Sequence, residues 1–107
     1  MIFIETPLFT KLILDLMSEE KYSELQKALI LRPDMGDLIP GSEGLRKIRW
    51  GVEGRGKRGG VSVIYYWKVR QDQIIFLLAY PKNVQDNLSP EQLQRLKKVM
   101  TEELSNG

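Results

Sequence analysis

Six basic side chains lie close together in the middle of this chain and could hold the phosphate groups of a polyanion. They fall within residues 46–58, where Glu53 is the one acid. The whole chain has a net charge of +2 and this window carries +5, so the remainder sums to −3. Such a concentration of charge favours a nucleic acid as the partner, with an ordinary solvated charge run as the alternative. The six residues are Arg46, Lys47, Arg49, Arg55, Lys57 and Arg58.

Two residue types that the chain lacks limit the chemistry of this window. There is no histidine, which is the commonest general base near neutral pH and the commonest metal ligand. There is no cysteine, which excludes disulfides and thiolate chemistry and is typical of a reducing cytoplasm. No cluster of Asp and Glu suggests a metal site, so we expect neither a metal nor a cofactor. Proton transfer would fall to lysine, arginine, tyrosine or a carboxylate.

Two phosphate-binding motifs occur in this window by chance. Residues 54–59 satisfy GxGxxG, and residues 51–57 satisfy GxxxxGK. Both motifs need a helix directly after them, whereas a strand rich in β-branched and aromatic residues follows here. We therefore interpret the glycines as a hairpin loop whose backbone N–H groups and basic side chains could face phosphates. A simple solvated turn is the alternative.

The N-terminal third predicts a short strand over residues 1–5 and then a helical hairpin. Thr6 before Pro7 is typical of a helix start, with a hydroxyl N-cap and proline at the first helical position. Ser18, followed by two acids, predicts a second N-cap. Apolar residues recur at helical spacing after each cap until Pro33 ends the hairpin.

The rest of the chain predicts three strands and a final helix. The residue types of 34–44 predict turns throughout, and strands are expected over 45–50 and 61–68. The run 74–80 is apolar on both faces, as in a covered central strand. The capping box SPEQ opens a helix over 89–104. The order β-α-α-β-β-β-α predicts an α+β fold, with a mostly antiparallel sheet, an N-terminal helical hairpin and a C-terminal helix.

Length and hydropathy predict a single domain over residues 1–107. A chain of 107 residues is large enough for one core without disulfides or metals. The N-terminus has no basic leader, and the longest apolar run, 74–80, is far shorter than the roughly 20 residues that span a bilayer. We therefore expect a soluble cytoplasmic protein that does not associate with a membrane.

Several stretches of the sequence closely resemble the RelE/HigB toxin superfamily of bacterial type II toxin–antitoxin modules, and its HigB-like branch most of all. They are GLRKIRW, GRGKRGG, VIYYW, IIFLLAYPKN and LSPEQ, and the resemblance covers nearly the whole chain. It implies the β-α-α-β-β-β-α fold and a ribosome-dependent endoribonuclease that cuts messenger RNA in the ribosomal A site and inhibits translation. It also implies neutralisation by a cognate antitoxin, typically a helix-turn-helix protein in the HigB branch.

Cleavage of RNA by its own 2′-hydroxyl needs a base, an acid for the 5′-oxygen and donors for the charge on phosphorus. Arg49 and Arg58 suit the phosphate because arginine stays charged. Lys47 and Lys57 are the candidates for proton transfer, because neighbouring arginines disfavour the protonated form of a lysine.

Further candidates come from the strand ends and the remaining basic residues. Tyr80 ends the central run and Lys82 follows it, where side chains emerge near a site, and the two would form the opposite wall. Arg46, Arg55 and Tyr66 would contact the RNA, with stacking as the role of the tyrosine. Alternation puts about half of the neighbouring aromatic residues in the core.

Two positions depart from the family pattern. Ser62 takes the place of the arginine regarded as central to RelE-type catalysis, and Leu88 lies near the place of a tyrosine found before the last helix. Alternation places Ser62 on the strand face opposite Val61 and Val63. One alternative is therefore a catalytically weakened or inactive RNA- or ribosome-binding member of the same fold. Another is a purely structural partner of the antitoxin.

Overall fold

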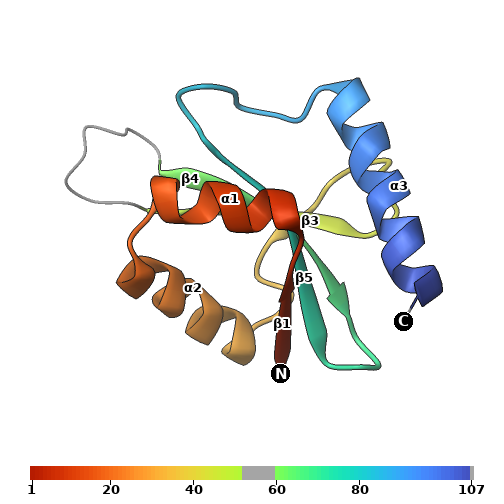
Figure 1. Cartoon of the computed structure of the whole chain (residues 1–107), viewed down its shortest axis with the longest axis horizontal. Helices are drawn as coiled ribbons and strands as arrows, with labels where there is room; N and C mark the ends of the chain where they lie inside the picture. Colours follow the sequence, from red (N-terminus) through yellow and green to blue (C-terminus); the bar gives the residue numbers. More distant parts are fainter. Residues whose placement is uncertain (52–59, 107) are drawn as a thin grey trace.

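The structure is a computed structural model, which describes residues 1–51 and 60–106. Within these residues the strands form one five-stranded sheet, and helices pack on both of its faces (Figure 1). The elements are β1 (Ile2–Glu5), α1 (Pro7–Leu16), α2 (Glu19–Leu31), β2 (Asp37–Leu38), β3 (Leu45–Trp50), β4 (Val61–Lys68), β5 (Gln73–Pro81) and α3 (Pro90–Asn106).

The predicted α+β fold is confirmed, with one addition. The short strand β2 lies in the segment 34–44, where the sequence predicted turns throughout, and that prediction was wrong at residues 37–38. This strand is defined by its antiparallel pairing with Arg46 and Lys47 of β3. A two-residue edge strand has too little sequence to show a pattern of its own.

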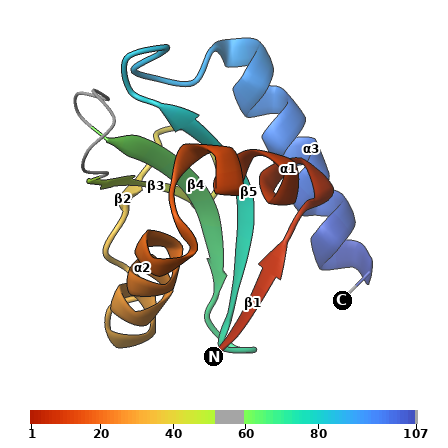
Figure 2. The same cartoon turned by 60° about the vertical axis from the view of Figure 1, so that its left-hand side comes forward.

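The sheet has the order β1-β5-β4-β3-β2. Strand β1 pairs parallel with β5, and the other pairings are antiparallel. Helices α1 and α2 cover one face and α3 packs on the other, as the two views of the ribbon show (Figure 2). Strand β5 is therefore covered on both faces, as its continuous apolar run predicted.

The helix starts form at the predicted caps. The hydroxyl of Thr6 accepts from the backbone N–H of Phe9 at 3.2 Å, and the hydroxyl of Ser18 caps α2 in the same way. The capping box of α3 is reciprocal: the Gln92 N–H donates to Ser89 Oγ at 3.1 Å, and the Ser89 N–H donates to Gln92 Oε1 at 3.0 Å. Each cap satisfies backbone donors that the helix itself leaves unpaired.

Alternation along β4 divides its side chains between two cores. Val61, Val63 and Tyr65 pack beneath α1 and α2, whereas Ile64 packs beneath α3. Ser62 therefore lies on the face opposite Val61 and Val63, as the sequence predicted. None of the helices in the described part of the chain is long and apolar enough to cross a bilayer.

Candidate functional site

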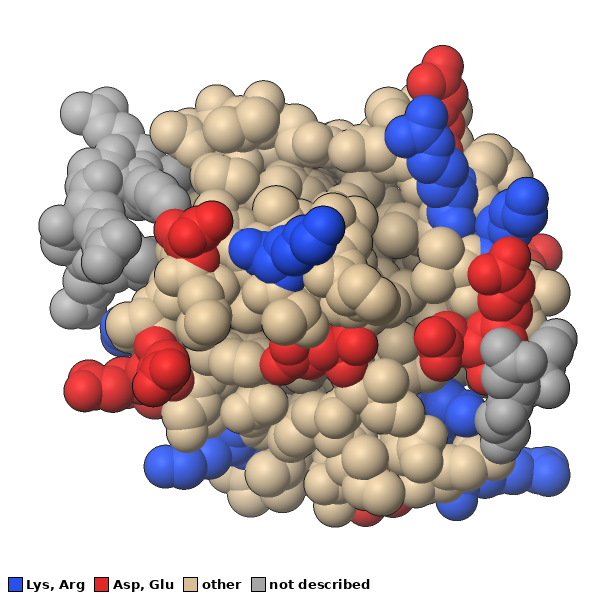
Figure 3. Space-filling model, in the orientation of Figure 1, with Lys and Arg blue, Asp and Glu red and all other residues tan. Residues whose placement is uncertain are grey.

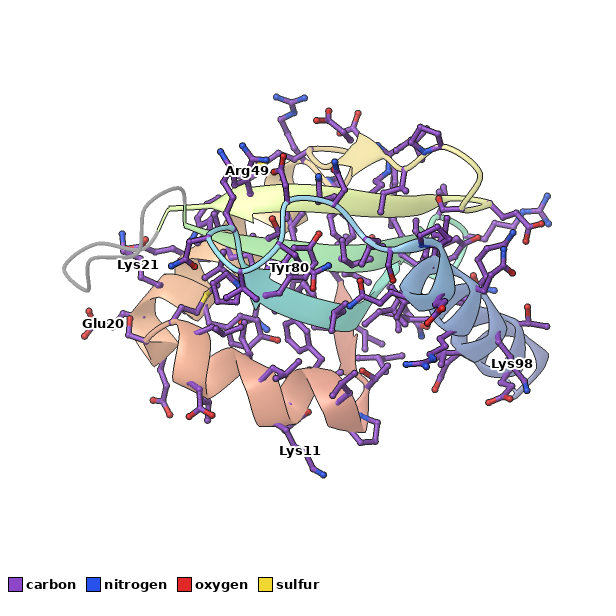
Figure 4. The ribbon with its side chains drawn as sticks, turned by 90° about the horizontal axis from the view of Figure 1, so that it is seen from above. Lys11, Glu20, Lys21, Arg49, Tyr80 and Lys98 are labelled. Atoms are coloured by element: carbon purple, nitrogen blue, oxygen red, sulfur yellow. The ribbon has the colours of Figure 1, made fainter. Side chains whose placement is uncertain are left out.

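Three predicted site residues form one row across the sheet. Arg49 of β3 lies opposite Ser62 of β4, and Ser62 lies opposite Tyr80 of β5. Residues directly opposite one another in a sheet project from the same face and contact one another. The row lies on the α3 side of the sheet, and Figure 4 labels two of its members, Arg49 and Tyr80. We refer to these three residues as the cross-strand row.

The two hydroxyl groups of the row are buried without partners. Ser62 has 0% and Tyr80 has 5% of its surface exposed. The two hydroxyls lie close enough to interact with each other, but within the described residues neither Ser62 Oγ nor the Tyr80 hydroxyl has a partner of good hydrogen-bond geometry. Most buried polar groups are hydrogen-bonded, and leaving one unpaired costs about 1–3 kcal/mol. Two such groups side by side could form hydrogen bonds with a polar ligand.

The phenol of Tyr80 keeps its proton over a wide pH range. Burial raises its pKa, and the negative charge of Asp86 raises it further. The nearby hydroxyl of Ser62 and the positive charge of Arg49 oppose this rise. Since the ordinary pKa of tyrosine is already about 10, the phenol is a neutral hydrogen-bond donor at physiological pH.

The connection between β5 and α3, residues 82–89, reaches two of the three basic side chains of β3. Arg49 Nη2 lies 3.3 Å from Asp86 Oδ1, in an exposed ion pair. Lys47 Nζ donates to Asn87 Oδ1 at 3.0 Å and to the backbone carbonyl of Asp86 at 3.3 Å. Figure 4 shows this connection running alongside Arg49 and Tyr80. Lys47 and Arg49, two residues apart on one strand, share the face of the row.

Asp86 and Asn87 were not among the residues predicted from the sequence. One signal could have pointed to them, because they stand between the end of the covered strand and the capping box of the last helix. A connection from Tyr80 to a helix packed on the same face must pass the end of the row.

The structure separates two predicted RNA contacts from the row. The Arg46 guanidinium donates to the backbone carbonyls of Gly36 at 2.7 Å and of Asp34 at 3.2 Å, so it ties the turn after α2 to the sheet. Tyr66 shares the face of Ser62 but is half-buried against the core beneath α3. It lies four residues further along β4, which is roughly 13 Å away.

Lys82 follows β5 directly and is half-buried. Its backbone N–H donates to the carbonyl of Gly60 at 3.1 Å, which joins the end of β5 to the start of β4. Lys82 thus lies two residues after Tyr80, the last member of the row. The predictions for Arg55, Lys57 and Arg58 concern residues outside those that the structure describes.

Charge on the opposite side of the molecule is arranged differently. Figure 3 shows the face covered by α1 and α2, where Lys and Arg side chains are scattered and interspersed with Asp and Glu. Across the described ranges 1–51 and 60–106, no group of three or more acidic side chains is placed to hold a metal ion. The candidate site therefore consists of the cross-strand row with Lys47, Asp86 and Asn87 at its edge.

A comparison with known protein families identifies the chain. The family described as the RelE toxin of the RelE/RelB toxin–antitoxin system matches residues 34–106. This chain belongs to the RelE toxin family. It is a toxin of a toxin–antitoxin system, and toxins of this family pair with an antitoxin. The match begins after α2 and includes the whole cross-strand row. The superfamily inferred from the sequence is thus confirmed, and the HigB-like branch stays a prediction.

Proposed function

We propose that this RelE-family toxin is a ribosome-dependent endoribonuclease that cuts messenger RNA and so inhibits translation. The observation that carries the proposal is the cross-strand row, with a charged guanidinium beside two buried hydroxyl groups that lack partners. Hydrogen-bond donors held ready for a developing negative charge are the usual source of catalysis at a phosphate. The family supports this reading, since its toxins are generally endoribonucleases.

Each side chain of the site would have a distinct role. Arg49 would bind the two non-bridging oxygens of the scissile phosphate, because its planar fork stays charged and donates twice. Lys47, or Lys57 outside the described residues, would take the proton of the attacking 2′-hydroxyl. The 2′-oxygen would then form its bond to phosphorus as the 5′-oxygen leaves. Tyr80 is suited to donate to that leaving oxygen, because its raised pKa keeps it protonated.

Arg49 must exchange one anion for another when RNA binds. Its present partner, Asp86, is 66% exposed, and Arg49 itself is 44% exposed. An ion pair this open to water contributes at most about 1 kcal/mol, so a phosphate could replace the carboxylate at little cost. The row offers few further contacts, which is consistent with a message that the ribosome positions. Action on ribosomes would place the toxin in the cytoplasm.

Ser62 favours a second candidate function, a weakened or inactive member of the fold that only binds RNA or the ribosome. Its short hydroxyl cannot supply the charge of the arginine that the family pattern has at this place. Losing one preorganised donor to the transition state typically costs about 10²–10³ in rate. The two candidates therefore differ in cleavage and agree in binding.

Cleavage of a defined message on purified ribosomes tests the proposal. The toxin should cut within the A-site codon, and Arg49→Ala should lower the rate at equal ribosome occupancy by at least about 10²-fold. Arg70→Ala is the matched control, since Arg70 is exposed in the turn between β4 and β5. Its rate should equal that of the unaltered chain. Ribosome binding without any cut would establish the second candidate instead.

The proposed partner of the toxin is a cognate helix-turn-helix antitoxin, as the resemblance to the HigB branch implies. Co-expression of the two proteins should restore growth and yield a stable complex. Growth arrest that the neighbouring gene product does not relieve would count against this partner.

A further inference from the structure

A small pocket lies beside the cross-strand row, and Lys47 is its one lining residue that was given a role in cleavage above. Its volume is about 210 Å³, and three segments meet around it: the chain after β2, the strand β3, and the start of α3 with the residues before it. Apolar walls with a few polar groups are the usual composition of a small-molecule site. The lining residues are Ile39, Pro40, Lys47, Asn87, Leu88 and Leu93.

Lys47 joins this pocket to the site. It lines the pocket and lies two residues from Arg49 on the same face of β3, a separation of about 7 Å. That is close to the distance between neighbouring nucleotides in an extended RNA strand. An RNA whose phosphate binds at Arg49 would therefore bring the next nucleotide to the pocket.

The polar edge of the pocket presents donors. Lys47 Nζ donates to Asn87 Oδ1, and an ammonium group can only donate, so this contact defines which way the Asn87 amide points. The amide oxygen is engaged by the cation, and the NH₂ group is left to donate. With Lys57 as the base of the proposed reaction, Lys47 stays an ammonium; it uses two of its three N–H groups, on Asn87 and on the carbonyl of Asp86, and keeps one more.

We infer that this pocket binds the base of the nucleotide beside the scissile phosphate and selects a base whose edge offers two acceptors. Guanine has such an edge in O6 and N7, whereas adenine combines one acceptor with one donor. The apolar walls would contact the faces of the ring, and the donors of Lys47 and Asn87 its edge. This inference rests on the proposed endoribonuclease function and names its sequence preference.

The variant Asn87→Asp tests the inference most directly. It keeps an oxygen for Lys47 and replaces the donating NH₂ group with an acceptor. The toxin would be added to ribosomes that carry randomised messages, and the ends of the cut messages would be sequenced. The unaltered toxin should favour guanine over adenine at one fixed position next to the cut by roughly three- to tenfold, the value of one net hydrogen bond. Asn87→Asp should abolish this preference or turn it towards adenine and cytosine.

Asn83→Asp is the control, because it makes the same chemical change on the same connection but outside the pocket. It should keep the guanine preference. A toxin that cuts without a base preference beside the cut, or a guanine preference that survives Asn87→Asp, would overturn the inference and leave the endoribonuclease standing.

If no message is cut, the proposed function fails. A binding measurement then tests separately whether the pocket binds guanine. Guanosine 3′-monophosphate and adenosine 3′-monophosphate would each be titrated into ¹⁵N-labelled toxin. Shifts of the Leu88, Leu93 and Asn87 signals that are larger with the guanine nucleotide support the inference. Equal shifts, or none, overturn it.

Discussion

Tyr65 on β4 and Tyr80 on β5 are both buried in the same sheet, yet their hydroxyl groups have opposite surroundings. The Tyr65 hydroxyl donates to the backbone carbonyl of Pro33 at 2.8 Å and accepts from the N–H of Gly36 at 2.8 Å. The Tyr80 hydroxyl has no partner among the described residues and lies in the row with Ser62. One tyrosine fastens a turn to the sheet, and the other is left with unused hydrogen-bonding capacity.

This difference separates a structural tyrosine from a candidate functional one, although burial alone does not. The N–H of Trp67 shows that a lone unpartnered group is a weak signal. Trp67 packs beneath α1 and α2, and its cross-strand neighbour is the apolar Ile74. At Tyr80 a second unpartnered hydroxyl and a charged guanidinium lie in the same row, and this combination points to a ligand.

The largest expected effect is on cleavage. Tyr80→Phe should lower the rate at which the toxin cuts ribosome-bound message by about 10²-fold, because it removes a donor to the leaving oxygen. Tyr65→Phe should leave the rate per folded molecule unchanged, because that hydroxyl contacts only backbone. Single-turnover cleavage at saturating toxin measures both. Equal losses in the two variants would erase the functional distinction between the tyrosines.

Stability should follow the reverse order. Tyr65→Phe leaves the N–H of Gly36 and the carbonyl of Pro33 unpaired, so it should lower the free energy of unfolding by about 1–3 kcal/mol. Tyr80→Phe removes a hydroxyl that is unpaired in the folded chain, so the free energy of unfolding should stay the same or rise slightly. Urea denaturation followed by tryptophan fluorescence gives both values. A Tyr80→Phe variant as unstable as Tyr65→Phe would mean that Tyr80 also has a structural partner.

A smaller effect should appear when one negative charge is removed from each side of the molecule. Asp86→Asn frees Arg49 from its ion pair and should tighten ribosome binding by about two- to fivefold at low salt, a gain that added salt screens. Asp15→Asn makes the same change on α1, which covers the other face, and should alter binding less. Sedimentation binding over a salt series would compare them. Equal gains would show that net charge, rather than the contact to Arg49, controls binding.

Much of the fold could be predicted from the sequence because its signals are local. The caps at Thr6, Ser18 and Ser89 depend on residues within one turn of helix, and all three form as predicted. The two-residue strand β2 could not be predicted, because pairing with β3 is all that defines it. Arg46 could not be sorted from Lys47 by charge alone, and the sheet directs their side chains to opposite faces.

By itself the sequence determined which residues of a strand share a face. Alternation alone puts Lys47 with Arg49, and Ser62 opposite Val61 and Val63. It could not place Tyr80 on the face of Ser62. Counting by twos from Ile75 and Leu77, which pack beneath α3, would put Tyr80 on the α1 side of the sheet.

Only the tertiary structure decided that Tyr80 completes the row. Ile64 of β4 pairs with Leu78 and the next residue, Tyr65, pairs with Phe76, so β5 holds one extra residue between them. That residue shifts the later part of β5 by one position and turns Tyr80 towards Ser62 and α3. Such a shift arises from the pairing of two strands, so it cannot be predicted from the alternation within either strand alone.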